Sequence, residues 1–444
     1  MQSRLRRASG FAAVGTLALA APALGRAAAV PFAAVAVLAA FVVEEGPLFE
    51  LFARPGDYED RRLNGLAGFS LAAAGLALLA TVPRSPLPMS VFVAAVFVVA
   101  YGNLGAQFVR ESTTDDVLVA TGFVVAGFLA ATLGQLAVAL YRVRTGGGGG
   151  VAGTAPDAAL LALAGGLTAA LLREMLYQRD DPLVMLTAGF SLWLLAALSP
   201  SVSAFTFGLA LAVTVGLGVV AHGLGTASVT GLLTGVLLAV VLIVLGGLGW
   251  FAALITFFGV GALSTKFRYD EKADRGVAQE NDGARGSGNV LGNAAVAMLA
   301  VVGYAATQRF GLPVAPEIFR FAFAGSLAAA MSDTLSSELG GLFDSPRLIT
   351  SLEPVDPGTD GAVTWQGELA GVTGAAVLAA VVVALFPVGV VGGAAVVVAG
   401  FVGMTVDSFL GATVEGDRVS NEAVNFLATL SGAVAAVALA VPLA

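Results

Sequence analysis

Long apolar runs separated by short polar segments fill almost the whole chain. A helix needs about 20 residues, with a range of roughly 17–25, to cross the hydrocarbon core of a bilayer. Because backbone polar groups in lipid must pair within their own segment, we interpret each run as a helix. The pattern predicts an all-α, polytopic integral membrane protein with roughly 13–15 transmembrane helices. The candidate runs are 11–25, 29–43, 64–82, 89–109, 117–140, 156–172, 182–198, 203–221, 226–246, 248–264, 289–308, 316–332, 363–386, 388–406 and 421–442.

The charged loops between these runs predict an orientation. If Arg4, Arg6 and Arg7 are cytoplasmic, the loops that hold most of the charge fall on the same side, and the opposite loops are short. Basic residues near helix ends favour the cytoplasmic side of a membrane. We therefore expect a multi-pass protein of the cell membrane with a cytoplasmic N-terminus. The charged loops are 44–63, 110–116, 173–181, 265–288, 333–362 and 407–420.

Composition supports this class of protein and excludes others. The 444 residues are 57% hydrophobic and 12% charged, with a mean hydropathy of +0.90, which is typical of membrane proteins. A net charge of −8 argues against a nucleic-acid partner. The chain has no cysteine, which excludes thiol catalysis, disulfides and cysteine-bound metals.

A Gly-rich segment at 146–155 interrupts the pattern. Such segments behave as flexible linkers, so we place a domain boundary there. It separates an N-terminal membrane domain, 1–145, from a C-terminal membrane domain, 156–444, in which polar motifs recur. These motifs form three polar clusters, which lie on one side of the membrane if two helices separate each adjacent pair.

The first polar cluster, 261–293, holds both lysines of the chain, Lys266 and Lys272. An ammonium group is a compact, strongly hydrated point charge that suits phosphate oxygens. Arg285, Asn289 and Asn293 follow at successive i+4 positions, so they form a stripe on one helix face if the next helix begins near 287. Such a stripe either binds an anion or provides an N-terminal cap and polar packing.

The second polar cluster, 331–364, contains Asp333 and Glu338 directly after an apolar run. Carboxylates at a membrane-embedded helix end are costly to leave unpaired and indicate a functional site. The loop beyond them contains Arg347 and a tight turn whose backbone N–H groups can face a phosphate, although such turns also occur without a ligand. The turn includes Gly358, Thr359, Asp360 and Gly361.

The third polar cluster, 407–427, begins with Asp407 at the end of one run and reaches Asn425 in the last one. The chain has no Walker-type phosphate loop, no dinucleotide-binding glycine motif and no paired-histidine zinc motif. Nucleotide chemistry would therefore need an all-helical site. Mg²⁺ held by one or two carboxylates and by phosphate oxygens is compatible with these clusters.

The three clusters together resemble one family, that of transmembrane protein 19 and the plant phytyl-phosphate kinase of vitamin E synthesis. The resemblance covers residues 200–444 and rests on GALSTKFRYDEK, ENDGARGSGNVLGN, SDTLSSELG, PGTDGAVTWQG, and DSFLGA with VNFL. The segment after Glu280 has one arginine fewer than the family usually has. The resemblance implies transfer of a phosphoryl group from a nucleoside triphosphate, with CTP a candidate, to a polyprenyl or phytyl monophosphate.

The N-terminal part carries a second resemblance. YGNLGAQFVRE, residues 101–111, is similar to the Gly-Asp-rich segment of the phytol and dolichol kinases and the CDP-diacylglycerol synthases. Asn103 stands where that group has an aspartate. The resemblance therefore implies a degenerate, non-catalytic copy of a prenol kinase.

The chemistry of the residues agrees with a kinase. Donor and acceptor are both polyanions, so fixed cations and Mg²⁺ must screen them before they approach in line. A prenyl tail would lie between apolar helices in the bilayer. The predicted cations are Lys266, Lys272 and Arg285, and the predicted metal ligands are Asp333, Glu338 and Asp407. The residues predicted to bind substrate or nucleotide are Asn289, Asn293, Arg347, Gly358, Thr359, Asp360, Gly361 and Asn425.

A secondary transporter of a small polar or anionic solute is the alternative. Gly-rich, discontinuous helices with acidic residues at their ends are also typical of transporters. A transporter should place its charges near the middle of the membrane, in two pseudo-symmetric halves. The sequence places them at loop ends on one side, and it leaves the oligomeric state open.

Overall fold

Helices make up nearly all of the regular structure in the computed structural model. The structure describes residues 2–146, 150–176, 181–198, 202–225, 227–279, 286–416 and 419–440. The chain forms two compact units, Met1–Leu209 and Ala210–Ala444. The division falls inside helix α11 (Ala204–Leu224).

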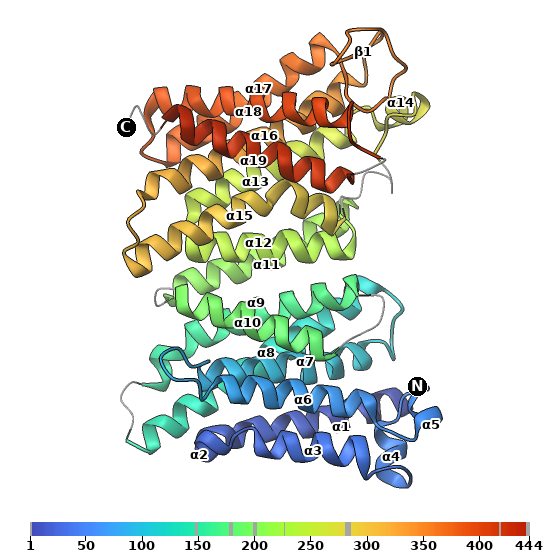
Figure 1. Cartoon of the computed structure of the whole chain (residues 1–444), viewed down its shortest axis with the longest axis vertical. Coiled ribbons are helices and arrows are strands. Elements are labelled where there is room, and N and C mark those ends of the chain that lie inside the picture. The colour runs from blue at the N-terminus through green and yellow to red at the C-terminus, as the bar shows by residue number, and fades with distance from the viewer. Residues whose placement is uncertain are drawn as a thin grey trace. The chain divides into compact units, whose positions relative to one another are not determined.

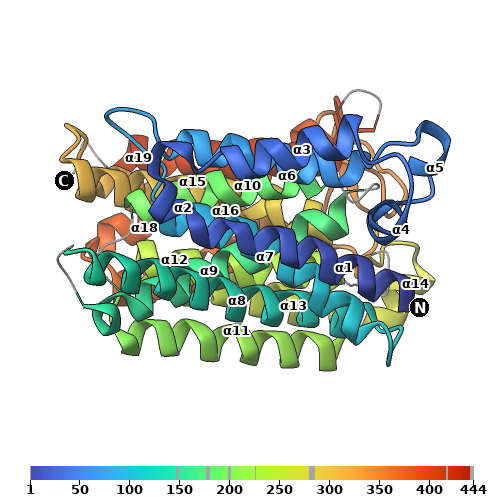
Figure 2. The ribbon, with the colours of Figure 1, turned by 90° about the horizontal axis from the view of Figure 1, so that it is seen from below.

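The N-terminal unit is a bundle of helices that run side by side along a common direction (Figures 1 and 2). Helix α7 is its centre, because every residue from 91 to 100 is buried; a helix that is apolar on all sides belongs in the interior of a bundle. The elements are α1 (Gln2–Gly15), η1 (Thr16–Ala20), α2 (Ala21–Leu24), η2 (Gly25–Ala27), α3 (Val30–Phe41), α4 (Pro47–Phe52), α5 (Asp57–Asp60), α6 (Asn64–Leu79), α7 (Met89–Val109), α8 (Asp116–Arg144), α9 (Val151–Met175) and α10 (Asp181–Leu198).

The C-terminal unit is built around helix α16. Every residue of α16 from 323 to 332 is buried, and the helix packs against α13, α15, α17, α18 and α19. The elements after α11 are α12 (Val229–Leu245), α13 (Leu248–Lys266), α14 (Tyr269–Asp274), α15 (Ser287–Phe310), α16 (Pro316–Gly340), β1 (Arg347–Leu348), β2 (Ala362–Val363), α17 (Trp365–Leu385), α18 (Gly389–Gly411) and α19 (Asn421–Ala440). Strands β1 and β2 pair antiparallel, with Arg347 opposite Val363.

Glycines allow the helices around α16 to approach closely. A Cβ atom added at Gly432 of α19 would lie 2.6 Å from the carbonyl oxygen of Gly325 in α16. A Cβ atom added at Gly292 of α15 would lie 2.8 Å from the carbonyl oxygen of Glu422 in α19. Because lipid gives helices no hydrophobic reason to associate, such close backbone packing is a main source of cohesion in membrane bundles.

The fold class predicted from the sequence is confirmed. In the part of the chain that the structure describes, ten helices are long and apolar enough to cross a membrane, and four shorter apolar helices accompany them. The four shorter helices coincide with predicted runs, but their described apolar stretches have 17 residues or fewer, so ten of the roughly 13–15 predicted helices are long and apolar enough for a full span. Large apolar side chains such as Leu263, Leu299 and Val390 are exposed, as expected where a helix faces lipid.

The unit boundary differs from the predicted one. The Gly-rich segment 146–155, of which 147–149 lie outside the described residues, is inside the N-terminal unit. Residues 151–155 of the segment already belong to helix α9, so this half is helical rather than a linker, and α9 packs directly against α8. The segment therefore joins two neighbouring helices of one unit, and the units divide at 209 and 210.

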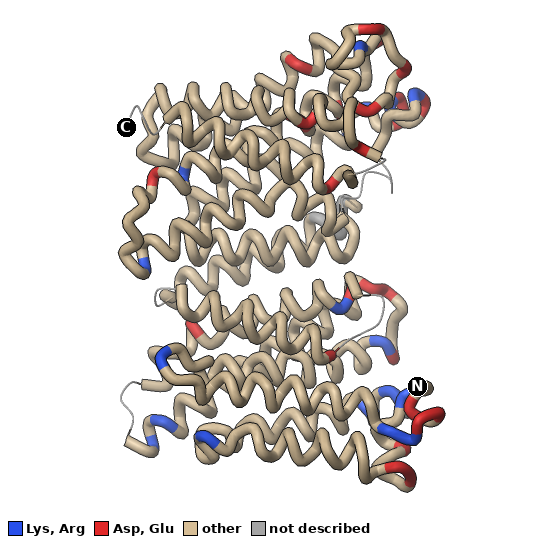
Figure 3. Tube along the Cα trace, in the orientation of Figure 1, with Lys and Arg blue, Asp and Glu red and all other residues tan. Residues whose placement is uncertain are grey.

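Charged residues of the C-terminal unit gather at the end that carries α14 and β1 (Figure 3). The ends of α13, α16 and α18 and the starts of α15, α17 and α19 alternate along the chain, so successive antiparallel helices bring them to this end. All three polar clusters therefore meet there.

Candidate functional site

A polar cavity of about 530 Å³ lies at the end of the C-terminal unit where the three polar clusters meet. Its walls come from the start of α15, the end of α16, the loop that contains β1 and β2, the end of α18 and the start of α19. Nine residues that the sequence nominated line it: Asn289, Asn293, Asp333, Gly358, Thr359, Asp360, Gly361, Asp407 and Asn425. Residues far apart in sequence thus form a single site.

Two carboxyl groups face each other in the polar cavity. Asp333 of α16 and Asp407 of α18 lie within hydrogen-bonding reach of each other, and Glu415 acts electrostatically on Asp407 from the loop after α18. The Oδ1 atom of Asp407 is buried and has no hydrogen-bond partner among the described residues. Buried polar atoms normally have a partner, so an orphaned carboxylate oxygen indicates a ligand or ion that completes the site.

Two asparagine pairs line the polar cavity from neighbouring helices. In α15, Asn293 Nδ2 donates to the backbone oxygen of Asn289 at 3.0 Å. In α19, Asn425 Nδ2 donates to Asn421 Oδ1 at 2.9 Å. The close approach at Gly292 brings the two helices together between these pairs, because its Cβ position lies 3.3 Å from the Cβ of Asn425. The Oδ1 atom of Asn289 is buried and, among the described residues, without a partner.

The predicted turn forms one wall of the polar cavity. Gly358 and Gly361 have φ values of +84° and +74°, which residues with a Cβ atom rarely adopt. A Cβ atom at Gly361 would also lie 2.5 Å from the backbone oxygen of Ser408 and the backbone nitrogen of Ala412. Only glycine therefore lets this turn pack against the end of α18.

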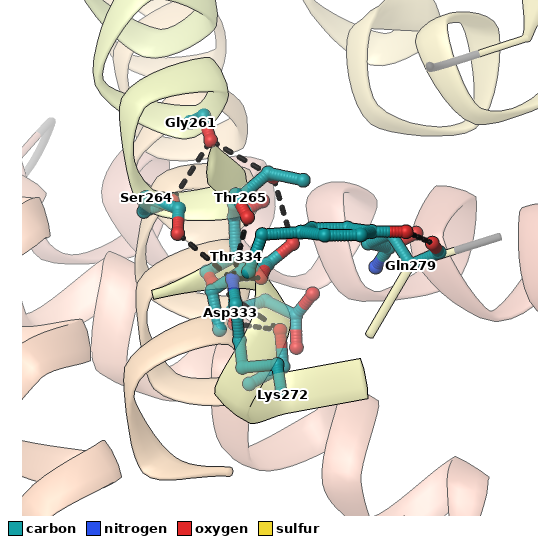
Figure 4. Close-up of polar contacts among 10 residues, drawn as sticks. Gly261, Ser264, Thr265, Lys272, Gln279, Asp333 and Thr334 are labelled. Atoms are coloured by element: carbon teal, nitrogen blue, oxygen red, sulfur yellow. Dashed lines mark hydrogen bonds and ion pairs between the residues drawn. The ribbon is translucent and has the colours of Figure 1, made fainter. Parts of the chain in front are cut away.

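Lys272 and Glu338 form a buried ion pair outside the polar cavity. Lys272 Nζ donates to Glu338 Oε2 at 2.5 Å, and the two side chains are 1% and 2% exposed. The same ammonium donates to the backbone oxygens of Ser264 (3.0 Å) and Thr265 (2.6 Å), and Thr265 Oγ1 donates to Glu338 Oε1 at 2.7 Å. Figure 4 shows this network between the end of α13, α14 and α16. Lys272 was predicted as a phosphate-binding cation and Glu338 as a metal ligand, but neither residue lines the polar cavity.

The other nominated cations also lie apart from the polar cavity. Arg347 is exposed, and its Nη1 donates to the backbone oxygen of Leu352 at 2.6 Å, so it supports the loop. Arg285 lies outside the described residues. Lys266 lines a different, apolar cavity of about 620 Å³ between α11, α12, α13 and α15.

Helix α15 contributes to the walls of both the apolar cavity and the polar one. Val290 lines the apolar cavity and its neighbour in the chain, Asn289, lines the polar one. Lys266 Nζ lies 5.7 Å from the ring centre of Tyr269, and Tyr269 donates its hydroxyl to the backbone oxygen of Gln279, a polar-cavity residue, at 2.9 Å. Lys266 thus lines the apolar cavity and contacts Tyr269, which donates a hydrogen bond to a residue of the polar one.

The geometry narrows the predicted metal-ligand set. Among the described residues, no three Asp, Glu or His side chains are grouped as metal ligands, and Glu338 is engaged by Lys272. Asp333 and Asp407 remain as a pair. Two carboxylates that share a site with phosphate oxygens are a common way to bind Mg²⁺, and the orphaned Oδ1 of Asp407 fits such a role.

Asn421 and Glu415 belong to the site but were not nominated from the sequence. Both line the polar cavity, and Asn421 Nδ2 donates to Glu415 Oε1 at 2.9 Å. A signal for Asn421 was available, because it precedes Asn425 by four residues on one helix face, as Asn289 precedes Asn293. Gln279, which also lines the cavity, has no comparable pattern.

Comparison with known proteins identifies the family. The sequence model of the family described as integral membrane protein DUF92 matches residues 212–433. The chain belongs to this family. The match coincides with the C-terminal unit and includes every residue of the polar cavity, and it confirms the family resemblance that the motifs indicate.

Relatives of the chain come from a cyanobacterium, an archaeon and a plant. An uncharacterized membrane protein of Synechocystis is 32% identical over 205 residues, which cover 44% of this chain and 77% of the relative. One of Methanocaldococcus jannaschii is 36% identical over 197 residues, with 42% and 75% covered. Protein VTE6, chloroplastic, of Arabidopsis thaliana is 32% identical over 145 residues, with 31% and 43% covered. No solved structure matches significantly.

Proposed function

We propose that the C-terminal unit is a membrane-embedded kinase that transfers a phosphoryl group from a nucleoside triphosphate to a prenyl monophosphate. The observation that carries this proposal is the polar cavity with its facing carboxyl groups, together with an apolar cavity that Lys266 lines and that shares helix α15 with it. An amphiphilic phosphate has a matching shape, since its phosphate needs polar surroundings and its tail needs apolar ones. A volume of about 620 Å³ is within the usual range for small-molecule pockets.

The reaction needs positioning more than acid–base chemistry. A phosphate monoester has its second ionisation near pH 6, so at neutral pH it presents an ionised oxygen as the nucleophile. That oxygen forms a bond to the γ-phosphorus of the nucleotide, the bond from this phosphorus to the β-phosphate oxygen breaks, and a nucleoside diphosphate leaves. The products are the nucleoside diphosphate and a prenyl diphosphate. Because this oxygen is already ionised, the proposed reaction needs no general base from the protein.

The residues of the two cavities have distinct roles in the proposal. Asp333 and Asp407 would hold Mg²⁺, which when bound neutralises phosphate charge. The amide groups of the two asparagine pairs donate hydrogen bonds to phosphate oxygens. Lys266 holds the phosphate of the prenyl substrate as a point charge, while its tail occupies the apolar cavity. Lys272 and Glu338 act as positioning residues that fix α14 and α16.

The test is a transfer assay with the full-length protein in nanodiscs. Labelled CTP or ATP is supplied with phytyl or geranylgeranyl monophosphate, and prenyl diphosphate is measured by mass spectrometry. We expect diphosphate formation by the unmodified protein and a loss of at least about 100-fold, about 2.7 kcal/mol of barrier, in Asp407→Asn. Asp356→Asn is the control, because Asp356 is exposed in the neighbouring loop and does not line the cavity; it should retain full activity.

Two results would overturn the proposal. One is equal diphosphate formation by Asp407→Asn and Asp356→Asn, which would remove the carboxylate pair from the reaction. The other is gradient-driven solute uptake into liposomes with no nucleotide consumed, which would favour the transporter. The position of the cavity at helix ends, rather than midway along them, favours the kinase.

A further inference from the structure

The N-terminal unit contains a second cavity, of about 340 Å³, with a strongly basic lining. Four arginines line it, and Asp181 is the single carboxylate among its lining residues. The arginines are Arg4, Arg7, Arg54 and Arg173. Such a lining has a net positive charge, in a chain whose total charge is −8. The proposed kinase site makes no use of this cavity.

Asp181 is fully occupied by contacts within this arginine cavity. Its Oδ2 accepts from Arg54 Nη2 at 2.6 Å, and its Oδ1 accepts from Arg173 Nη1 at 2.7 Å. Asn103 Nδ2 also donates to Oδ1, at 3.2 Å. The carboxylate is 5% exposed. Asp181 therefore holds Arg54 and Arg173 in place, and its single negative charge is shared between these two arginines.

Arg4 and Arg7 take no part in the ion pairs with Asp181. Among the residues that the structure describes, no carboxylate forms an ion pair with either of them. Arg54 and Arg4 both repel Arg7. The nearby Asp57 attracts Arg7, but its two oxygens already accept the backbone N–H groups of Arg54 (2.8 Å) and Asn64 (3.0 Å). Like charges held together in a partly buried cavity are unfavourable unless an anion neutralises them.

The arginine cavity lies at one end of the N-terminal unit. Arg4 is near the start of α1, Arg173 is in the last turn of α9, Asp181 begins α10, and Gln107 is near the end of α7. Figure 3 shows basic segments, together with acidic ones, beside the N-terminus. Since α1, α7, α9 and α10 all belong to apolar spans, this end of the unit is at the membrane surface.

We propose that the arginine cavity binds a phosphate group at the membrane surface. The planar guanidinium group offers paired N–H donors that match phosphate oxygens, which a single ammonium does not. Arg4 and Arg7 supply the charge, Arg54 and Arg173 are held in fixed positions by Asp181, and the amide of Gln107 adds a donor. The phosphate belongs either to a lipid headgroup or to a soluble phosphate, and both share this chemistry.

The experiment measures binding by the purified full-length protein in maltoside micelles, which contain no phosphate. The probes are inorganic phosphate, dioctanoyl phosphatidic acid and, as a neutral comparison, dioctanoylglycerol, each titrated by isothermal calorimetry. We expect saturable binding of at least one phosphate probe and a loss of tenfold or more in Arg4→Gln/Arg7→Gln. Arg6→Gln is the matched control, because Arg6 is exposed on the same helix and does not line the cavity; its affinity should change less than twofold.

The outcomes separate the source of the phosphate and can overturn the proposal. Tighter binding of phosphatidic acid than of inorganic phosphate by tenfold or more identifies a lipid headgroup, and equal binding identifies a soluble phosphate. If the double variant misfolds on size-exclusion chromatography, the single variant Arg4→Gln, at an exposed position, should still bind several-fold more weakly. No binding of either phosphate probe, or equal binding by Arg4→Gln and Arg6→Gln, would overturn the proposal. None of these measurements depends on turnover by the C-terminal unit.

Discussion

The buried pair of Lys272 and Glu338 allows a quantitative test of how the polar cavity is supported. The carbonyl groups of Ser264 and Thr265 are in the last turn of α13, where a helix has no partners of its own for its backbone oxygens. Lys272 satisfies both carbonyls and Glu338 at once. It thus caps α13, ties α14 to it and attaches both to α16. We predict that removing one member of the pair is worse than removing both.

The expected magnitudes follow from burial. Lys272→Met leaves the Glu338 carboxylate buried and unpaired, which costs about 3–5 kcal/mol. Glu338→Leu leaves a buried ammonium and has a cost of the same order. The double variant has no unpaired charge, and Thr265 Oγ1 can still donate to the backbone oxygen of Gly261. What remains is the loss of two carbonyl partners, about 1–3 kcal/mol.

The assay is thermal unfolding followed by tryptophan fluorescence. Trp193→Phe in every variant removes the signal of the N-terminal unit and leaves Trp250 and Trp365 as reporters. For a unit of this size each kcal/mol shifts Tm by roughly 2–4 °C, so each single change should lower Tm by roughly 6–20 °C. The double variant should be more stable than either single variant.

The control and the refuting result are equally specific. Lys266→Met changes the other, exposed lysine and should cost no more than about 0.5–1 kcal/mol, the usual worth of an exposed contact such as the one between Lys266 and the Tyr269 ring. If the stability losses of the two single variants add up to the loss of the double variant within about 0.5 kcal/mol, the two charges are not coupled. The buried ion pair would then have no role in holding α14 against α16.

Two further predictions concern the walls of the two cavities. Gly361→Ala should destabilise the C-terminal unit by about 2–4 kcal/mol in thermal unfolding, because Gly361 combines a positive φ with a close backbone contact. Gly416→Ala is the control: Gly416 has a similar φ but no neighbour within 4 Å, so the change should cost only about 1–2 kcal/mol. Equal losses of stability in the two variants would contradict the argument from the backbone contact. Lys266→Ala should raise KM for the prenyl monophosphate about tenfold in steady-state assays and leave KM for the nucleotide unchanged. Lys266→Arg should recover part of the affinity for the prenyl monophosphate. An unchanged KM for the prenyl substrate in Lys266→Ala would indicate that Lys266 only anchors the helix at the membrane surface.

The sequence predicts the membrane fold and nine of the residues that line the polar cavity for one physical reason. In a membrane protein, polar residues are rare and costly within apolar helices, so their positions carry information. Asp333 and Asp407 stand out at the ends of apolar runs, and antiparallel helices bring alternate ends together. Asn289 and Asn293 were predicted because amides four residues apart share one face of a helix, and Asn425 was predicted from its place in the last apolar run.

The rarity of polar residues did not predict the roles of the lysines, because the pattern of a short polar segment does not show which of its side chains are buried. Lys266 and Lys272 are six residues apart in the same charged segment. In the structure Lys266 is exposed and lines an apolar cavity, whereas Lys272 is buried. The short helix α14 produces the difference: Arg268, with φ of +50°, turns the chain after α13. That turn directs Lys272 back toward the carbonyl groups of α13. A left-handed arginine leaves no signature in hydrophobic periodicity.

The separation of the two lysines also explains how one short segment can serve two purposes in the proposed kinase. A cavity that holds two facing carboxylates needs rigid walls, because like charges push the helices that bear them apart. The buried ion pair joins α16, which carries Asp333, to α13 and α14, and the chain then runs from α14 into residues 276–279 of the cavity wall. Lys266, six residues earlier at the end of α13, lines the apolar cavity. In the proposed kinase, Lys272 would fix the helix that carries Asp333 and Lys266 would present a cation to the prenyl phosphate, two roles that need the buried and the exposed environments in which the structure places the two lysines.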